Sequence, residues 1–252
     1  MNALRRHEMI METLLAQQEA TVQQLSEKLQ VTGKTIREDL AKLEEKGLLV
    51  RVHGGARLAH GDQFGLLSNA TPLVKHVREK EEIAQAAMGL IRSGDIIALD
   101  NGSTTLEIAR QLPNEPLTVV TNDLHIIAEL TRKEQIRLVV PGGTRMRNML
   151  VGAEGTAFVR SLNIQKAFVS ATGVHLQQGL TVYTGELIDY KRALIEVSET
   201  VYAVADHHKF GQSALRTFAE LREVSRILTD SGLPDETAEA FRQAGIDLYR
   251  GR

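Results

Sequence analysis

The sequence predicts an α/β chain in which an N-terminal winged helix-turn-helix domain precedes a larger α/β domain with a mainly parallel sheet. The first observation is a set of short apolar stripes at helical spacing, followed by a hairpin signal. The second is a change of pattern after Asp95, where β-branched runs alternate with helical stretches. We therefore divide the 252 residues into a domain at 1–58, a linker at 59–78 and an α/β domain at 79–252.

Composition narrows the class of protein. A hydrophobic fraction of 42% allows a sizeable core, and the absence of cysteine excludes disulfides, thiolate zinc sites and cysteine nucleophiles. No apolar run reaches the length of a membrane span, and no signal-peptide core precedes the first helix, so we expect a cytoplasmic protein without membrane contact. The net charge of -2 gives no signature of nucleic-acid binding over the whole chain. Any affinity for DNA must therefore come from a local arrangement of charges, used in two copies.

Helical patterns account for residues 4–46. The first helix is expected from Leu4 to Gln17, and the second opens at a capping box made by Thr21 and Gln24. A turn of helix-turn-helix length then leads to Thr32, a good N-cap for the third helix. The third helix has one apolar stripe, formed by Ile36, Leu40 and Leu43. It is expected to end at Lys46 and Gly47, a basic residue in the last turn followed by a glycine.

The exposed start of the third helix carries Lys34, Thr35 and Arg37, the kind of donors that recognition helices present to base edges. Residues 48–52 then alternate, with Arg51 and His53 opposite Val50 and Val52, and Gly54 with Gly55 turns the chain back. This pattern predicts a small wing. An amphipathic helix and hairpin with no partner, or one that binds protein, fits the same local pattern.

Six β-branched runs follow in the second half: Ile96–Leu99, Leu117–Val120, Ile136–Val140, Ala167–Val169, Val201–Val204 and Ile227–Leu228. Near-continuous apolar strands indicate a sheet covered on both faces, and ligands of such sheets bind at the carboxyl ends of the strands. After the first run, Gly102 allows close backbone approach, and Ser103, Thr104 and Thr105 open a helix. Hydroxyls and a helix N-terminus suit a phosphate, although an ordinary helix cap has the same appearance.

Other polar segments follow the remaining strands. They comprise Thr121-Asn122-Asp123, Pro141-Gly142-Gly143-Thr144-Arg145, Ser170-Ala171-Thr172-Gly173 and Asp206 to Gly211, with Glu186 and Lys191 on one predicted helix. An arginine such as Arg145 can pair with phosphate bidentately, or lie on the surface without a ligand. Because the carboxyl ends of parallel strands share one edge, these segments together indicate a binding site more strongly than any one alone.

Several motifs carry a resemblance to a known family. In the first part they are Arg5-Arg6-His7, the run from Val31 to Leu40, the run from Leu43 to Gly47, and the run from Arg51 to Ala56. With these motifs, residues 5–58 resemble the winged helix-turn-helix of the DeoR family of bacterial transcriptional regulators. We assign DNA contacts to Arg5, Thr21, Thr32, Lys34, Thr35, Arg37, Arg51, His53 and Gly54.

The second part resembles the sugar-sensing domain of the same family. The matching motifs are Asp100-x-Gly102-Ser103-Thr104-Thr105, Thr121-Asn122, Gly142-Gly143 with Arg145, Glu186 with Lys191, and Asp206-x-x-Lys209-Phe210-Gly211. One departure is His208, where relatives usually carry serine. The assigned effector-binding residues are Asp100, Gly102, Ser103, Thr104, Thr105, Thr121, Asn122, Gly142, Gly143, Arg145, Thr172, Gly173, Glu186, Lys191, Asp206 and Lys209.

The resemblance implies a regulator, most often a repressor, that senses a phosphorylated sugar or polyol and binds operator DNA as a homo-oligomer, a dimer or a tetramer. It also implies a domain similar to ribose-5-phosphate isomerase and glucosamine-6-phosphate isomerase. We expect the phosphate at residues 102–105, with Arg145 as a second anchor, and the sugar hydroxyls at Asp100, Glu186 and Lys209. The oligomer interface is expected in the large α/β part.

The alternative function is that of a sugar-phosphate isomerase-like enzyme fused to a DNA-binding domain. Asp100, Glu186 or Asp206 would then act as the general base, while Lys191 or Lys209 stabilises an enediolate. A protein-binding adaptor is a third possibility, but it leaves the phosphate-like loops unexplained. The fused winged helix favours the regulator, because an isomerase has no need of it. No cofactor is expected, and no metal, because the histidines His7, His53, His125, His207 and His208 lack a metal-ligand spacing.

Overall fold

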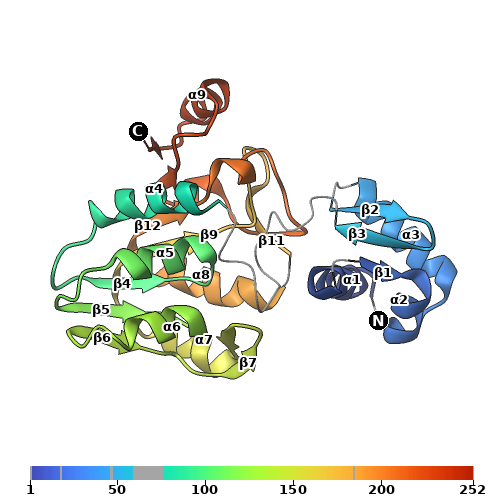
Figure 1. Cartoon of the computed structure of the whole chain (residues 1–252), viewed down its shortest axis with the longest axis horizontal. Coiled ribbons are helices and arrows are strands. Elements are labelled where there is room, and N and C mark those ends of the chain that lie inside the picture. The colour runs from blue at the N-terminus through green and yellow to red at the C-terminus, as the bar shows by residue number, and fades with distance from the viewer. Residues whose placement is uncertain (1, 18, 46–47, 59–75, 184, 252) are drawn as a thin grey trace. The chain divides into compact units, whose positions relative to one another are not determined.

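The computed structural model describes the chain except residues 1, 18, 46–47, 59–75, 184 and 252, and for Leu15, Ala16 and Glu186 it describes the backbone alone. The chain forms two compact units, of which the second comprises His76–Val182 and Glu186–Arg252. Figure 1 shows the chain coloured from blue at the N-terminus to red at the C-terminus. Most of the expected linker, 59–75, and the predicted helix stop at Lys46 and Gly47 lie outside the described residues.

The N-terminal unit contains the three predicted helices: α1 (Ala3–Gln17), α2 (Val22–Leu29) and α3 (Gly33–Glu45). Their apolar stripes meet in one core, in which Ile10, Leu14, Leu25, Ile36 and Leu40 are almost fully buried. The predicted caps are present. Thr21 Oγ1 accepts from Gln24 N at 3.2 Å while Gln24 Oε1 accepts from Thr21 N at 2.8 Å, and Thr32 Oγ1 accepts from Thr35 N at 3.3 Å.

The predicted wing is an antiparallel hairpin of β2 (Leu49–Val52) and β3 (Gly55–Leu58). The valines that we placed opposite Arg51 and His53 are not buried, since Val50 is 37% and Val52 is 41% exposed. The hairpin is anchored by Leu48 and Leu49 instead. A third strand, β1 (Glu19–Thr21), pairs with β3 and was not predicted, because its few residues show no alternation. Gly55 is required there, since a Cβ atom would lie 2.3 Å from the Ala20 carbonyl oxygen.

The second unit is built on a parallel sheet, as predicted. Its strand order in the described chain is β15-β14-β12-β9-β4-β5-β6, and every ladder between these neighbours is parallel. The strands are β4 (Ile96–Leu99), β5 (Leu117–Val120), β6 (Ile136–Val139), β9 (Ile164–Ser170), β12 (Ser198–Val204), β14 (Arg226–Thr229) and β15 (Leu248–Arg250).

Helices cover both faces of the sheet and divide its core in two. Alternate residues such as Ile97, Leu99 and Phe168 pack with α4 (Val77–Met88), α5 (Ser103–Gln111) and α6 (Leu124–Leu130). The residues between them pack with α7 (Ala153–Arg160), α8 (Ile188–Val197) and α9 (Asp235–Gln243). Figure 1 shows α4, α5 and α6 side by side along one face. Burial on both faces explains why the strands are apolar without alternation.

The structure differs from the prediction in the bounds of α4 and in several short elements. Helix α4 begins at Val77 and ends at Met88, whereas the pattern indicated residues 79–91. Two small antiparallel sheets were not predicted: β10 (Gly173–His175) with β11 (Gly179–Val182) and β13 (Arg216–Ala219), and β7 (Thr144–Met146) with β8 (Met149–Val151). Three-residue strands are too short to show a period. Three 3₁₀ turns complete the described chain: η1 (Gly185–Leu187), η2 (His207–Lys209) and η3 (Leu221–Glu223).

Two further results concern the element that carries Glu186 and the expectation that no segment spans a membrane. Glu186 does not share a helix with Lys191, as we had expected, because Glu186 lies on η1 and Lys191 on α8. In the described part of the chain, no helix has the length and apolar character needed to cross a membrane.

Candidate functional sites

The exposed face of α3 carries the side chains that we assigned to DNA. Lys34, Arg37 and Thr32 are exposed and Thr35 is half-buried, while Ile36 and Leu40 dock the opposite face into the core. The helix follows α2 through residues 30–32, where Gln30 adopts a left-handed conformation with φ 52°. The arrangement is that of a helix-turn-helix whose second helix presents cationic and hydroxyl donors from its first turn.

An ion pair between Arg51 and Glu44 ties the wing to α3. Arg51 Nε donates to Glu44 Oε2 at 2.6 Å, and the Arg51 backbone N–H donates to Glu44 Oε1 at 2.9 Å. Both side chains are partly exposed, so solvent screens the pair and its contribution to stability is small. His53 and Gly54, at the tip of the wing, are exposed. Arg51 is therefore held at a defined position beside the recognition helix.

The basic motif at the start of α1 consists of the exposed Arg5, the half-buried Arg6 and the buried His7. Arg5 is exposed and pairs with Glu8 at 3.2 Å. Arg6 donates from Nε and Nη2 to both carboxylate oxygens of Asp39, at 2.7 and 3.1 Å, and His7 Nε2 lies 2.9 Å from Asp39 Oδ1. Burial by itself raises the pKa of Asp39, but hydrogen bonds from Arg6 and His7 outweigh it and leave the pKa lowered. Sequence reasoning missed this clamp between α1 and α3.

At the carboxyl edge of the large sheet, the ends of β4 and β9 meet helix α8. Lys191 Nζ donates to Asp100 Oδ2, and also to the Ser170 carbonyl oxygen at 2.8 Å. The Ser170 backbone N–H donates to the same Asp100 oxygen at 3.1 Å, and Ser170 Oγ donates to the Asn101 carbonyl at 2.6 Å. Burial lowers the pKa of Lys191, and the Asp100 carboxylate opposes this shift without cancelling it. The edge therefore has a buried, charged and hydrogen-bonded floor.

Buried polar atoms at this edge lack partners in the described structure. They are Asp100 Oδ1, Thr104 Oγ1, Asn122 Oδ1, Tyr190 Oη, Asp206 Oδ1 and Thr229 Oγ1. Such atoms are uncommon in folded proteins, because each one loses its hydrogen bonds to water without a replacement. The six residues follow or end strands of the sheet, lie in the first turn of α5, or lie on α8 beside Lys191. Their gathering at one edge is what a site built to hold a polar ligand or ordered water requires.

The start of α5 supplies donors to the same edge. Its N-cap is Gly102, with φ +152°, and no side chain among the described residues caps the helix. A Cβ atom on Gly102 would lie 2.9 Å from Ser170 Oγ, so glycine is required for the approach of the β4–α5 loop to β9. The first-turn N–H groups, including those of Thr104 and Thr105, are thus left for an acceptor.

The neighbouring helix α6 is different. Asp123 caps it with a carboxylate that accepts from His125 N at 2.8 Å and Ile126 N at 3.1 Å. Burial is the largest influence on Asp123 and raises its pKa. An anion therefore finds unoccupied donors at α5 but an acidic cap at α6.

A second group of charges lies at the end of β12. Lys209 Nζ donates to the Ala171 carbonyl oxygen at 2.9 Å, which links η2 to the end of β9. Asp206 is buried, and so is Lys80 on α4. Burial lowers the pKa of Lys80, and the positive charge of Lys209 lowers it further, whereas Asp206 opposes both. Lys80 was not among the predicted site residues, nor was Ser170. The sequence did contain an indication that Lys80 is buried, because its helical spacing from Ile83, Ala84 and Ala87 places it on the apolar face of α4.

Other predicted effector residues follow β5 or lie on β7. Asn122 Nδ2 donates to the Leu150 carbonyl at 2.9 Å, and Thr121 Oγ1 accepts from Asp123 N at 3.2 Å. Arg145 lies exposed on β7, where its Nε donates to the Arg147 carbonyl at 2.9 Å. No contact in the described structure brings Arg145 to Gly102 or Thr104. The side chain of Glu186 lies outside the described residues.

The remaining predicted residues shape the backbone. Gly142 and Gly143 have φ of +79° and +121°, and a Cβ atom on Gly143 would lie 2.4 Å from the Val151 carbonyl oxygen. A Cβ on Gly173 would similarly lie 2.4 Å from the Gln212 carbonyl oxygen, and Thr172 N donates to the Thr181 carbonyl at 2.9 Å. The glycines position loops around the edge and have no side-chain donor to offer, whereas Thr172 is a buried residue with a hydroxyl.

A winged helix-turn-helix with an exposed basic recognition helix, joined to an α/β domain with unpaired buried polar groups, defines a DNA-binding regulator with a sensor domain. The model of the DeoR-like helix-turn-helix domain matches residues 6–61, and that of the DeoR C terminal sensor domain matches residues 75–231. The chain belongs to the DeoR family of transcriptional regulators.

Relatives support this assignment over nearly the whole chain. The HTH-type transcriptional regulator IolR of Bacillus subtilis is 33% identical over 243 residues, which cover 94% of this chain and 95% of that protein. The transcriptional repressor AccR of Agrobacterium fabrum is 37% identical over 227 residues, 88% of each chain. The lactose phosphotransferase system repressor of Staphylococcus epidermidis is 34% identical over 213 residues, 82% of this chain and 84% of that protein. These names are those of regulators, not of enzymes.

One solved structure with some likeness is ribose 5-phosphate isomerase A from Methanocaldococcus jannaschii. It has a TM-score of 0.40 and 18% sequence identity, over 52% of this chain and 53% of that chain. A likeness this distant carries no argument about activity.

Proposed function

We propose that the protein is a repressor of a carbohydrate-metabolism operon and that it responds to a phosphorylated sugar or polyol. The lactose phosphotransferase system repressor is one relative whose name concerns a sugar. The observation that carries the proposal is the set of unpaired buried polar atoms at the carboxyl edge of the sheet, next to the open N-terminus of α5. Two kinds of ligand group are thus accommodated side by side.

The phosphate is assigned to the first turn of α5. Oxygen atoms of a phosphate accept hydrogen bonds from helical N–H groups, and the positive end of the helix dipole favours the charge. Thr104 Oγ1 is buried without a partner at this turn and can donate to the same group. Arg145 would have to leave its bond to the Arg147 carbonyl to become a second anchor. Two cations lie at the end of β12: Lys80, which is buried on α4, and Lys209, which is half-buried on η2.

The hydroxyls of the ligand are assigned to the carboxylates. Asp100 keeps Oδ1 unpaired while Oδ2 is held by Lys191 and Ser170, and Asp206 likewise has Oδ1 unpaired. A fixed carboxylate oxygen that lacks a donor is suited to accept from a sugar hydroxyl. The same bonding argues against the isomerase alternative, since Asp100 is held as a partner of Lys191 and not poised as a free base.

The DNA-binding unit suits an operator with two half-sites. A single winged helix whose basic and acidic side chains nearly balance is a weak electrostatic anchor, so the protein should act as a homo-oligomer that places two copies on DNA. The α/β domain offers exposed apolar side chains for this contact, among them Phe158 at 43% and Val140 at 38% exposure. A regulator of this kind works in the bacterial cytoplasm, where the chromosome lies.

The effector assignment is tested by thermal shift of the full chain against a panel of sugar phosphates and polyol phosphates. A ligand at about 100 times its Kd stabilises the folded state by about 2.7 kcal/mol, enough to raise the melting temperature measurably. Thr104→Asp should abolish the shift by placing a negative charge at the phosphate position. Thr104→Val should weaken it by removing the donor alone. Thr131→Asp, which adds the same charge at an exposed position of the same domain, is the control.

Operator binding then separates the two functions of the chain. In the absence of effector, Thr104→Asp should bind operator DNA as the wild type does, as measured by fluorescence anisotropy. Addition of the effector should no longer change this binding, because a ligand shifts a two-state protein only through its different affinities for the two states. If Thr104→Asp responds to the effector like the wild type, the phosphate lies elsewhere. If neither protein binds operator DNA, the regulatory assignment itself is contradicted.

A further inference from the structure

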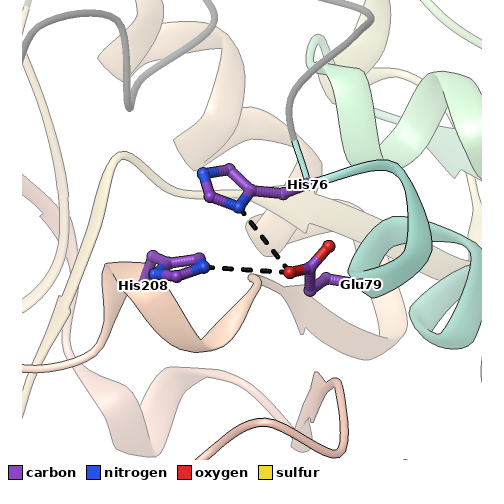
Figure 2. A group of neighbouring side chains, drawn as sticks. All are labelled: His76, Glu79 and His208. Atoms are coloured by element: carbon purple, nitrogen blue, oxygen red, sulfur yellow. Dashed lines mark ion pairs between the residues drawn. The ribbon is translucent and has the colours of Figure 1, made fainter.

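Two histidines and a glutamate meet at the start of the α/β domain, close to Asp206 and Lys80. His76 is the N-cap residue of α4, Glu79 lies in the first turn of the same helix, and His208 lies on η2 after β12. Figure 2 shows both imidazole rings turned toward one carboxylate oxygen of Glu79. The ligand atoms of the three side chains all lie within 4.8 Å of one another.

The distances in this cluster are too long for direct hydrogen bonds. His76 Nδ1 lies 3.7 Å and His208 Nε2 lies 3.8 Å from Glu79 Oε1. A nitrogen and an oxygen that share a proton approach to about 2.7–3.2 Å. Two ligands of one tetrahedral Zn²⁺ ion, each about 2.0–2.1 Å from the metal, lie roughly 3.4 Å apart. The two nitrogen–oxygen distances therefore exceed the spacing of metal ligands by only a few tenths of an ångström, and the two ring nitrogens lie within 4.8 Å of each other.

We propose that His76, Glu79 and His208 bind a Zn²⁺ ion, through Nδ1, Oε1 and Nε2 respectively. Imidazole nitrogen and carboxylate oxygen are ligands that Zn²⁺ takes at protein sites, and two His with one Glu leave a fourth position for water or a ligand. All three side chains are partly exposed, so the ion has a path from solvent. Sequence spacing hid the site, because His76 and His208 are separated by most of the domain.

Two further observations support a cation at this position. His76 has a left-handed backbone conformation, with φ 54° and ψ 43°, and a residue other than glycine seldom adopts it without a local reason. The second is a buried carboxylate close by: Asp206 attracts positive charge at His76 more strongly than Lys80 repels it, and Asp206 Oδ1 has no partner in the described structure. Negative charge beyond the first ligands favours a divalent ion.

The rings around the cluster are already packed in place. The His76 and His208 ring centroids lie 4.0 Å apart and those of His207 and His208 lie 3.8 Å apart, with the rings of each pair tilted relative to each other. His207 is itself held by Asp230, with Nδ1 2.6 Å from Oδ2. A bound ion would therefore connect the first turn of α4 to η2, the segment that also carries Lys209. This connection goes beyond the proposed sensing of a sugar phosphate and does not depend on it.

The test is zinc titration of the full-length protein after removal of metal with a chelator. Competition with a chromophoric zinc indicator should show one ion per chain in the wild type. His76→Ala and His208→Ala should each weaken binding by at least about 100-fold, more than the ~10–100-fold loss typical when only an outer partner of a ligand is removed. His125→Ala, which deletes an exposed histidine on α6, should bind as wild type does. Co²⁺ in place of Zn²⁺ should give visible absorption that the two ligand variants lose.

The controls keep the result interpretable. Without metal, the ligand variants should match the wild type in far-UV circular dichroism and in melting temperature, and only the wild type should gain stability when Zn²⁺ is added. Glu79→Gln, which keeps the side-chain size, should also weaken binding and serves if an alanine variant misfolds. Absence of stoichiometric binding by the wild type at micromolar Zn²⁺, or equal binding by the His208→Ala protein, would overturn the proposal.

Discussion

Lys191 Nζ and Asp100 Oδ2 form an ion pair that is almost completely buried, between helix α8 and the end of strand β4. The pair closes the floor of the candidate effector site, and Ser170 completes it with a backbone N–H and a carbonyl oxygen. Two charges in such a position are tolerated because each is neutralised and hydrogen-bonded by the other. Lys191 therefore neutralises the Asp100 carboxylate and also holds α8 against the ends of β4 and β9.

The first prediction follows from that burial. Lys191→Met should lower the free energy of unfolding by roughly 3–5 kcal/mol, because Asp100 is left buried and uncompensated. The double variant Asp100→Asn/Lys191→Met should recover part of the loss. Arg160→Met, which breaks an exposed pair with Glu196, should cost about 0–1 kcal/mol and is the control. Urea unfolding of the full chain measures all three. Equal losses for Lys191→Met and Arg160→Met would contradict the stabilising role of the buried pair.

The second prediction concerns the recognition helix. Arg37 is exposed near the start of α3, so Arg37→Ala should cost roughly 1–3 kcal/mol of discrimination between operator and non-operator DNA if it reads a guanine. Anisotropy titrations with both kinds of DNA measure it. An unchanged ratio of the two affinities would remove Arg37 from the base-reading set.

The third prediction concerns the wing. Arg51→Ala should weaken binding to all sequences and flatten the dependence on salt, because a phosphate contact carries no sequence information. Glu44→Gln supplies the matched control, since it frees Arg51 from its ion pair without removing the cation. Salt titrations should give Glu44→Gln a slope at least as steep as that of the wild type. A wild-type slope in Arg51→Ala would mean that this side chain does not reach DNA.

The fourth prediction is a dependence of stability on pH. The pKa of Asp39 is lower in the folded chain than in the unfolded one, because hydrogen bonds from Arg6 and His7 outweigh burial. Its carboxylate therefore stabilises the fold above the unfolded pKa of about 4, and this contribution is lost as pH falls through the lower folded value. Asp39→Asn should destabilise the protein at neutral pH by roughly 1.5–3 kcal/mol. Calorimetry should show that the difference from wild type shrinks below pH 4; a constant difference would contradict the assignment.

The fifth prediction is the oligomeric state. Light scattering of the full chain at micromolar concentration should give a dimer or a tetramer, since one wing and one recognition helix with little net charge anchor DNA weakly. Phe158→Glu places a charge on an exposed apolar position of α7 and tests that face as part of the contact. A wild type that remains monomeric at these concentrations would contradict the oligomer.

Local patterns in the sequence were sufficient for most of the fold. The capping box of Thr21 with Gln24 and the Thr32 cap lie within four residues of their partners, and both formed as predicted. The apolar runs became parallel strands. The short strands β1, β10 and β15 were missed, because three residues do not show a period. Glu186 was placed on the wrong element, because a 3₁₀ turn and the start of a helix have the same local composition.

Some residues of the candidate site could be identified from the sequence, and others only from the structure. Gly102, Thr104 and Asp100 could be found from the sequence, since a polar loop after an apolar run marks the carboxyl end of a parallel strand. Ser170 and Lys80 could not be given a role, because their significance depends on which elements lie next to them. Arg145 was expected as an anchor on the basis of its loop, but its hairpin directs Nε to the Arg147 carbonyl.

The sequence by itself determined the two-domain organisation, the recognition helix and the polar edge of the sheet, because these depend on periodicity, caps and chain order within a few residues. Only the tertiary structure decided the partners: Lys191 with Asp100, Arg6 with Asp39, and His76 with His208. Each pair joins residues that are far apart in the chain, and an ion pair or a metal site depends on side-chain atoms being within a few ångströms. That proximity is set by the order of strands and the packing of helices, which no local pattern encodes.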